Sequence, residues 1–389
     1  EAHCNKIIHM VSPDAIIMHT NGEITVYKLK GCQYIAPDEK PALIMCTSGT
    51  TGKPKGAMLS EKNILTNVSD IAGYFSMDKS DTILIARPLY HCAVLTGEFL
   101  TAIVRGANIR FYSEQFNPTK MFELIKEYGI TTFCGTPTLL SIMARFNRSN
   151  ATETLRHICI SGECMGTEVG RKIRAAFSPC RIYHIYGLTE ACPRVSYLPP
   201  EHFEEYPDCV GIPLKSVSIK ILNEQGNLCH ANEEGILYIK GDNVMLGYFK
   251  NPEATDETLK DGWYHTGDLG IIDRHGNIFI KGRIKNMLLS GNGQNIYPEE
   301  IEDKLNNLPY VQECVVVQRE GKLYGLVYPD PELVKKNGIS IKELNETMEQ
   351  NRKLLNAQIP AYEQIAGIIL RDEEFEKTPK RSIKRFLYS

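Results

Sequence analysis

The ten residues TSGTTGKPKG, from Thr47 to Gly56, combine the chemical groups that bind phosphate. Glycines let backbone N–H groups approach a ligand closely, hydroxyls donate hydrogen bonds, and lysines supply positive charge. The apolar run ALIMC, residues 42–46, comes directly before them and reads as a buried strand of a parallel sheet. A strand followed by such a loop predicts a phosphate-binding site; the alternative is a flexible surface turn.

The loop differs from the P-loop of kinases and GTPases. That motif requires a glycine, four further residues and then Gly-Lys-Ser/Thr at the start of a helix. Here Gly49 lies at the wrong distance from Gly52 and Lys53, and Pro54 follows them and removes a backbone donor. The residues therefore indicate another kind of ATP-using protein.

Two more polar loops, ISGE at 160–163 and YGLTE at 186–190, belong to a region in which strands and helices alternate. Such alternation predicts a mostly parallel sheet covered by helices on both faces. Ligands bind at the carboxyl ends of the strands in these sheets, so we expect all three loops to meet at one edge. The strand-like segments are DTILIA, NIRFY, TTFCG, HICIS and RIYHIY, and the helical ones include PTKMFELIKEYG and GTEVGRKIRAAF.

The pattern changes twice further along the chain. Residues from about 210 to 283 read as antiparallel hairpins with tight turns, and the residues after about 284 read as a small α+β unit. The predicted fold class is α/β, with a large domain over 1–284 and a small α+β domain over 285–389. The large domain divides into an α/β part to about 203 and a β-rich subdomain at about 210–283. Near the start, IIMHTNGEITVYKL reads as strand, Asn-Gly turn and strand.

Length and composition restrict the class of protein. At 389 residues the chain exceeds what one hydrophobic core usually serves, so two or more domains are expected. The net charge of −3, from 44 basic and 47 acidic residues, leaves no basic stripe for nucleic acid. The sequence shows no apolar run of membrane-spanning length and no signal peptide. The twelve cysteines are scattered and form no C-x-x-C pair, which suits reduced thiols in a cytoplasmic protein.

Six motifs in order resemble the adenylate-forming, or AMP-binding, superfamily. The loop SGNGQNIYPEEIE and the ending EKTPKRSIKRFLY resemble its long-chain fatty acyl-CoA synthetase branch more than its amino-acid-activating domains. The motifs are TSGTTGKPKG, YGLTE (186–190), GYFKNPEAT (247–255), YHTGDLG (264–270), GRIKN (282–286) and NIYPEEIE (295–302).

The resemblance implies a two-step reaction. A carboxylate, here of a medium- or long-chain fatty acid, attacks the α-phosphate of ATP, and the acyl-adenylate then passes its acyl group to coenzyme A. Mg²⁺ is the implied cofactor, and a lipid substrate would imply peripheral contact with a membrane. The alternatives are transfer to acyl carrier protein and a catalytically idle nucleotide-binding relative.

Roles follow from the matched motifs. The resemblance implies that Tyr186 stacks on adenine, Thr189 touches the α-phosphate, Glu190 holds Mg²⁺, and Asp268 accepts the ribose hydroxyls with Arg283 nearby. The alternatives are a core aromatic for Tyr186 and a turn aspartate for Asp268. The phosphate-binding and pocket-lining residues are Thr47, Ser48, Gly49, Thr50, Thr51, Lys55, Gly162, Glu163, His184 and Gly187.

The remaining roles concern the acyl site and the small domain. His91 in PLYHC is the acyl-site candidate, against the alternative of a structural histidine. Lys285 is the implied hinge about which the small domain rotates between the half-reactions, unless it is an ordinary loop lysine. The implied thiol loop contains Ser290, Gly291 and Gly293.

The sequence departs from the family at two places. Ser382 occupies the position of a lysine that acts in adenylation, and Lys380 and Lys384 lie two residues away on either side. We expect one of them, preferably Lys384, to replace it, although both could be solvated tail lysines. The phosphate loop begins at Thr47, so much of the family's N-terminal portion is expected to be absent here.

Overall fold

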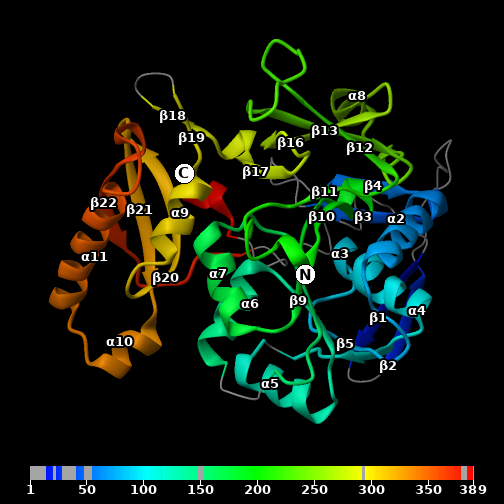
Figure 1. Cartoon of the computed structure of the whole chain (residues 1–389), viewed down its shortest axis with the longest axis horizontal. Coiled ribbons are helices and arrows are strands. Elements are labelled where there is room, and N and C mark those ends of the chain that lie inside the picture. Colours follow the sequence, from blue (N-terminus) through cyan, green and yellow to red (C-terminus); the bar gives the residue numbers. More distant parts are fainter. Residues whose placement is uncertain are drawn as a thin grey trace.

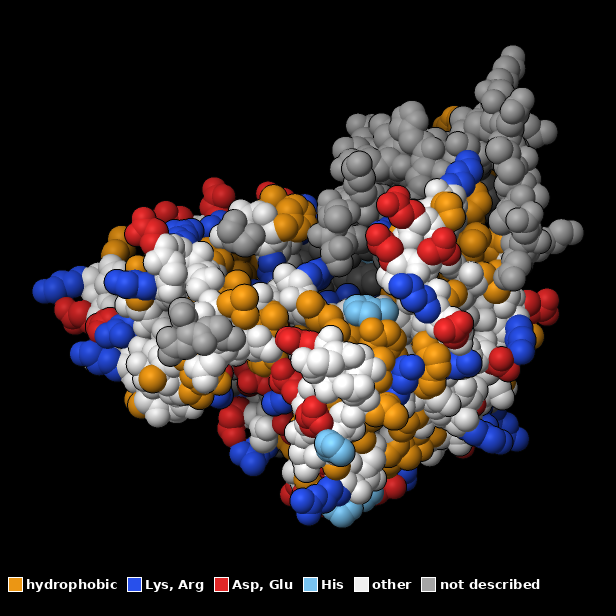
Figure 2. All heavy atoms as spheres, turned by 90° about the horizontal axis from the view of Figure 1, so that it is seen from above, with side chains coloured by type: hydrophobic (Ala, Val, Ile, Leu, Met, Phe, Trp, Pro, Cys, Tyr) orange, Lys and Arg blue, Asp and Glu red, His pale blue; other side chains and the backbone are white. Residues whose placement is uncertain are grey.

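The chain forms a large domain and a smaller C-terminal domain that lies beside it (Figure 1). On the face shown in Figure 2, acidic and basic side chains are interspersed over both domains. No helix in the described ranges is long and apolar enough to cross a membrane. The structure is a computed structural model that describes residues 15–20, 23–28, 41–47, 55–114, 116–147, 152–290, 294–377 and 383–388.

A seven-stranded sheet is the centre of the large domain, in the order β11-β10-β9-β8-β7-β5-β6. The five strands from β9 to β6 are parallel, and β10 and β11 are antiparallel, so the predicted parallel sheet is confirmed. The bounds are β5 Thr82–Ile85, β6 Asn108–Phe111, β7 Thr132–Gly135, β8 His157–Ser161, β9 Arg181–Gly187, β10 Arg194–Leu198 and β11 Ile212–Pro213.

Helices cover both faces because successive strand residues point to opposite sides. Ile158 and Ile160 of β8 pack into a core with Met121 of α5, while Cys159 packs on the other side with Ile71 of α2. The bounds are α2 Glu61–Tyr74, α5 Pro118–Glu127, α6 Pro137–Phe146 and α7 Thr167–Ala176, with a continuous helix of α3 Cys92–Val94, a π-helical turn Leu95–Leu100 and α4 Thr101–Arg105.

The phosphate loop does not follow a strand of this sheet, which corrects the prediction for residues 42–46. β3 (Leu43–Thr47) pairs antiparallel with β4 (Lys55–Leu59), in a separate three-stranded sheet of order β14-β4-β3. The chain returns from β3 to β4 within seven residues, whereas a parallel neighbour would need a crossover of a dozen or more. The loop is therefore the connection of a hairpin, and β3 is half-buried.

The β-rich subdomain contains the predicted hairpins, with sheet order β12-β13-β16-β15 and β17 paired to β16. At its edge β14 (Gly247–Tyr248) pairs with β4, which joins the subdomain to the phosphate hairpin. The other bounds are β12 Val217–Leu222, β13 Gly235–Gly241, α8 Pro252–Thr258, β15 Leu259–Lys260, β16 Trp263–Ile272 and β17 Ile278–Arg283.

The C-terminal domain has its own core, in which Ile301, Leu305 and Leu355 are fully buried. It contains the predicted helices and hairpin, together with α10 and β22, which the sequence analysis did not name; β22 pairs parallel to β21. The bounds are β18 Leu288–Leu289, β19 Asn295–Ile296, α9 Pro298–Asn306, β20 Val311–Arg319, β21 Lys322–Pro329, α10 Pro331–Asn337, α11 Ile341–Asn356 and β22 Ile365–Leu370.

A short hairpin, β1 (Ala15–Thr20) with β2 (Glu23–Lys28), confirms the two strands predicted near the start. Its Asn-Gly turn lies outside the described residues. The ten cysteines in the described ranges are free thiols, and seven of them are buried.

Candidate active site

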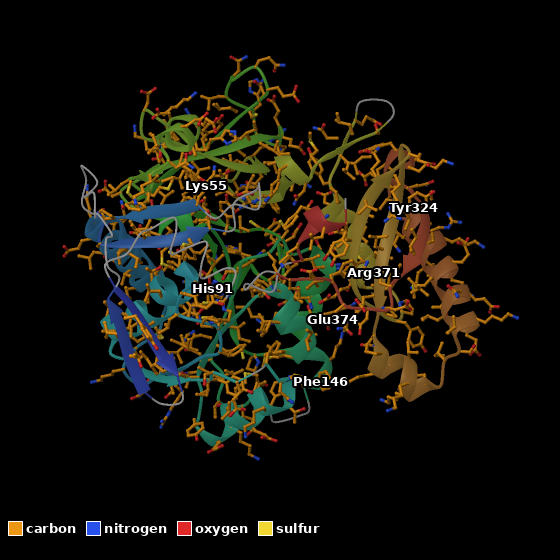
Figure 3. The ribbon with its side chains drawn as sticks, turned by 180° about the vertical axis from the view of Figure 1, so that it is seen from behind. Lys55, His91, Phe146, Tyr324, Arg371 and Glu374 are labelled. Carbon is orange, nitrogen blue, oxygen red and sulfur yellow. The ribbon has the colours of Figure 1, made fainter. Side chains whose placement is uncertain are left out.

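A cavity of about 1120 Å³ lies where β5, β7, β8 and β9 end. The β3–β4 hairpin, β16, β17 and the C-terminal domain complete its walls. In Figure 3 Lys55 lies above His91 in the large domain, and Arg371 and Glu374 lie on the side of the C-terminal domain that is turned toward the large domain. The residues predicted for the site that line the cavity are Thr47, Lys55, His91, Gly162, Glu163, Gly187, Thr189, Glu190, Arg283 and Lys285.

The two ends of the phosphate loop are held together at this wall. Thr47 and Lys55 are opposite each other in the β3–β4 register, and Oγ1 of Thr47 is 3.4 Å from the carbonyl oxygen of Lys55. The ammonium of Lys55 lies 4.9 Å from the ring centroid of Tyr248. The predicted phosphate-binding residues Ser48, Gly49, Thr50 and Thr51 lie outside the described residues.

Glu190, the predicted metal ligand, follows β9 in a short 3₁₀ turn, Thr189–Ala191. Its Oε1 accepts a 2.9 Å hydrogen bond from the hydroxyl of Tyr248, which is in turn 3.0 Å from the hydroxyl of Tyr264. Burial raises the pKa of Tyr248 above its usual range, so this phenol stays protonated and can donate. Glu190 is thus oriented by the hydroxyl of Tyr248, which is itself held by the hydroxyl of Tyr264.

Gly187 allows the chain to turn back beside Glu190. A Cβ at this position would lie 2.2 Å from the carbonyl oxygen of Pro193, a contact that backbone atoms cannot accommodate. Because Gly187 has no side chain, β9 can pair closely with β10 and bring Arg194 opposite Gly187. This close approach places Thr189 and Glu190 at the cavity wall.

Tyr186, Asp268 and Arg283 form one interacting group, in which Tyr186 and Asp268 are buried and Arg283 is partly exposed. The hydroxyl of Tyr186 donates to Oδ2 of Asp268 at 2.5 Å, and Nε of Arg283 lies 2.7 Å from Oδ1. The register of β16 and β17 puts Asp268 directly opposite Arg283. Burial raises the pKa of Asp268, while Arg283 opposes this by favouring the carboxylate. Ribose hydroxyls at Asp268 would therefore share a carboxylate whose two oxygens already have partners.

The structure places His184 differently from the predicted pocket. Its ring is 1 % exposed, and Nδ1 lies 2.9 Å from the carbonyl oxygen of Cys209, so the ring faces the protein interior rather than the cavity. Period-two alternation along β9 explains this, since His184 and Ile185 point to opposite faces and Ile185 lines the cavity. Glu163 does line the cavity and accepts from the backbone N–H and hydroxyl of Thr138, at 3.2 and 2.7 Å.

The predicted hinge residue lines the cavity, whereas the described residue of the predicted thiol loop does not. Lys285, in the 3₁₀ turn Ile284–Asn286, lines the cavity, and burial followed by the charge of Arg283 lowers its pKa. Ser290 lies at the end of β18 and closes a turn with Gln294 outside the cavity, while Gly291 and Gly293 lie outside the described residues. Ser290 therefore does not contribute to the cavity wall in this arrangement.

The closing segment of the chain brings a different lysine to the cavity from the one favoured by sequence. Nζ of Lys384 lies 3.0 Å from Oε2 of Glu376, and Lys384 is not among the cavity-lining residues. Lys377 lines the cavity and forms an ion pair with Glu313 of β20. Lys380 and Ser382 lie outside the described residues.

A magnesium ion would need phosphate oxygens to complete its ligand shell here. In the described ranges no group of three or more acidic, histidine or cysteine side chains is arranged to hold a metal. Glu190 offers one carboxylate at the wall, which suits a hard cation that is bound by one carboxylate and substrate phosphates. The donor set fits an ion that arrives with the nucleotide.

Sequence reasoning missed several residues that face the cavity. Tyr248 and Tyr264 occur inside quoted motifs, but nothing in their spacing predicts that Tyr248 bonds to Glu190 or that Tyr264 bonds to Tyr248. Lys377 and Glu313 are 64 positions apart in the sequence, and they form an ion pair because the fold brings Lys377 to strand β20, which carries Glu313. Arg87, directly before PLYHC, and Arg194, four positions after Glu190, line the cavity as well.

Comparison with known proteins agrees with this geometry. Residues 9–249 match the family described as AMP-binding enzyme, and residues 285–388 match the AMP-binding enzyme C-terminal domain. The chain therefore belongs to the AMP-binding enzyme family.

Named relatives include three CoA ligases. A feruloyl-CoA synthase of Amycolatopsis sp is 32 % identical over 279 residues, 71 % of this chain and 56 % of the relative. A 2-succinylbenzoate–CoA ligase of Bacillus subtilis is 32 % identical over 321 residues, 82 % and 64 % of the two chains. A long-chain-fatty-acid–CoA ligase of Escherichia coli O6:H1 is 31 % identical over 355 residues, 88 % and 63 %.

Among solved structures, an O-succinylbenzoate coenzyme A synthetase of Bacillus subtilis in complex with ATP and magnesium ion has a TM-score of 0.74 at 27 % identity, over 88 % of this chain and 68 % of that one. The fold class predicted from sequence is confirmed by this likeness. The chain spans between about half and two thirds of the length of the curated relatives described above.

Proposed function

We propose that this protein activates a carboxylic acid with ATP and transfers the acyl group to coenzyme A. The observation that carries the proposal is the single cavity shared by Thr47, Thr189, Glu190, Arg283 and Lys285. These residues come from three of the six motifs that mark the adenylate-forming family. Family membership and the CoA ligases among the relatives support the same reaction.

In the first step a carboxylate oxygen of the acid forms a bond to the α-phosphorus of ATP. The bond from that phosphorus to the bridging oxygen breaks, and pyrophosphate leaves. The residues supply position and charge: Lys55 and Arg283 are cations at the wall, and the Thr189 hydroxyl is available to the α-phosphate. A magnesium ion held by Glu190 and the phosphates would neutralise part of the phosphate charge.

In the second step the sulfur of coenzyme A attacks the acyl carbon. The carbon–sulfur bond forms, the bond from that carbon to AMP breaks, and the thiol proton passes to solvent. Ser290 is not among the cavity-lining residues in this arrangement, and we propose that the C-terminal domain rotates about Lys285 for this step. Acyl carrier protein remains the alternative acceptor.

ATP–pyrophosphate exchange, with a panel of carboxylic acids, tests the first step, and thioester formation from coenzyme A tests the second. Exchange that depends on both acid and Mg²⁺ is the expected result. Binding of ATP without exchange for any acid would indicate the alternative, a catalytically idle nucleotide-binding relative. The sequence motifs favour a fatty acid, but the names of the relatives cover aromatic and aliphatic acids, so the panel includes both.

A further inference from the structure

Helix α7 of the large domain and helix α9 of the C-terminal domain lie side by side across the domain boundary (Figure 1). Oδ1 of Asp303, on α9, accepts a 3.3 Å hydrogen bond from the backbone N–H of Gly166, the N-cap residue of α7. Further along both helices, the ammonium of Lys172 donates to Oδ1 of Asn307. A carboxylate of one domain therefore lies at the N-terminus of a helix of the other.

The sequence of α7 leaves its N-terminus without an acceptor of its own. In a capping box, polar side chains at the N-cap and three residues later satisfy the first N–H groups of the helix. Helix α7 has Gly166 and Val169 at these two positions and makes no side-chain cap. Helix α11, by contrast, has a complete capping box formed by Ser340 and Glu343. Asp303 takes the part of the missing acceptor, because the N–H of Gly166 donates to it.

The lack of a side chain at Gly166 makes room for this contact. A Cβ at Gly166 would lie 1.8 Å from Oδ2 of Asp303, and the three atoms nearest to it all belong to that carboxyl group. The backbone does not itself require glycine, since φ is −82° and ψ is 164°, which lie in the broad β region open to other residues. The glycine therefore serves the contact with α9 and not the path of the chain.

A negative charge is favoured at this point, because the free N–H groups at a helix N-terminus carry partial positive charge. Burial raises the pKa of Asp303, while the hydrogen bond from Gly166 opposes this by favouring the carboxylate. Since the two partners belong to different domains, the contact exists only while the domains keep this orientation.

The observed orientation suits the first of the two proposed steps. Glu313 and Lys377 of the C-terminal domain line the cavity, whereas Ser290 of the expected thiol loop does not. Lys377 belongs to the closing segment, to which the resemblance assigns a role in adenylation. Asp303 is not among the cavity-lining residues, so any effect of this side chain on the reaction passes through the orientation of its domain.

We propose that Asp303 is a positioning residue, whose contact with the N-terminus of α7 holds the C-terminal domain in the orientation for adenylation and is released before acyl transfer. This inference rests on the proposed two-step reaction. It adds a residue that sets the balance between the two steps.

The rates of the two half-reactions measure this balance. If each rate is proportional to the fraction of molecules in its own orientation, the ratio of adenylate formation to thioester formation from preformed adenylate follows the equilibrium between the orientations. We expect Asp303→Ala to lower this ratio by about three- to tenfold, the scale of losing one helix cap. Asp303→Asn keeps an acceptor for the N–H of Gly166 and should lower the ratio less. An unchanged ratio in Asp303→Ala would overturn the inference.

Gly166 provides an independent variant. Gly166→Ala places a Cβ against the carboxyl group and should lower the same ratio, although the backbone accommodates alanine. The double variant Gly166→Ala/Asp303→Ala should match Asp303→Ala, because the carboxyl group is already gone, and a loss equal to the product of the single effects would contradict a shared contact. If Asp303→Ala fails to fold, Gly166→Ala decides by the same criterion.

Ser340→Ala is the matched control, because it removes a helix cap that lies within the C-terminal domain and should leave the ratio unchanged. Hydrogen exchange separates the inference from the proposed function, since it needs no turnover. The N–H groups at the start of α7 should exchange at least about threefold faster in Asp303→Ala and at the parent rate in Ser340→Ala. Faster exchange in a protein that activates no acid would support the domain contact and refute the proposed activity. Unchanged exchange in Asp303→Ala would overturn the inference.

Discussion

The hydroxyl of Tyr248 donates a 2.9 Å hydrogen bond to Oε1 of Glu190, across 58 positions of sequence. Tyr248 belongs to β14, which pairs with the hairpin that carries the phosphate loop, and Glu190 follows the last parallel strand of the central sheet. The contact therefore joins the phosphate-binding hairpin to the strand that presents the predicted metal ligand. Two separate sheets meet at this one carboxylate.

Replacing the predicted metal ligand tests its role most directly. Glu190→Gln removes one negative charge with little change in shape, and ATP–pyrophosphate exchange should fall by roughly two to three orders of magnitude, the scale of one key electrostatic group. Hydrolysis of supplied acyl-adenylate should change much less. Glu168→Gln, at an exposed position on α7, is the matched control. ATP–pyrophosphate exchange at the normal rate in the Glu190→Gln variant would show that Glu190 is not the metal ligand.

Tyr248→Phe tests how far orientation of Glu190 matters. The variant keeps the ring against Lys55 but loses the hydrogen bond, so the carboxylate should be less well positioned for Mg²⁺. We expect the Mg²⁺ concentration for half-maximal exchange to rise by about three- to tenfold, the scale of one ordinary intramolecular hydrogen bond. Tyr238→Phe, on β13 of the β-rich subdomain, serves as the control. An unchanged Mg²⁺ dependence would show that the hydroxyl of Tyr248 does not help to position Glu190 for the metal.

Lys285→Pro tests rotation of the C-terminal domain. Proline fixes φ near −65° and removes a backbone donor, so the turn Ile284–Asn286 should lose its freedom to change conformation. Adenylate should still form, whereas thioester formation should slow. Lys285→Ala separates the backbone effect from loss of the cavity-lining ammonium. Equal loss of both half-reactions would indicate general misfolding.

The lysine that replaces the family residue at Ser382 can be found by substitution. Lys380→Ala, Lys384→Ala and the double variant are predicted to lose adenylation while preformed adenylate is still converted to thioester. Lys377 joins the series because it lines the cavity, and it is changed together with its partner as Lys377→Met/Glu313→Gln so that no buried carboxylate is left unpaired. Adenylation at the parent rate in the Lys380/Lys384 double variant would exclude both lysines, and selective loss in the Lys377 variant would assign the role to Lys377.

Protonation of His184 is predicted to destabilise the fold in acid. Burial lowers the pKa of His184 to about 4 from an ordinary 6.5, so the unfolded chain binds more protons between these values. The contribution to the free energy of unfolding is present above pH 6.5 and is lost as the pH falls toward 4, by about 3 kcal/mol at most. Urea unfolding at several pH values measures it. His184→Gln should flatten that part of the profile, and His275→Gln, in an exposed turn, should not.

The sequence alone was enough to predict a parallel sheet built from alternating strands and helices, and to identify the family. Apolar strands at regular spacing, such as HICIS and RIYHIY, carry their structure locally, because burial on both faces requires continuous apolar runs. The Asp268–Arg283 pair could not be derived from the turn at Gly276, because the register of β16 and β17 shifts between Leu269 and Gly270. Motif glycines such as Gly187 mark close backbone approaches that no other residue allows.

Only the tertiary structure decided which side chains share the cavity. The apolar run before the phosphate loop could form either a parallel or an antiparallel strand. It is antiparallel because its pairing partner is β4, the strand that follows the loop. His184 and Ile185 are adjacent in sequence, yet strand alternation sends one to the interior and the other to the cavity. The joining of Arg87, Glu98 and Arg194 depends on three elements that pack together, and long-range packing of this kind leaves no periodic signal in the chain.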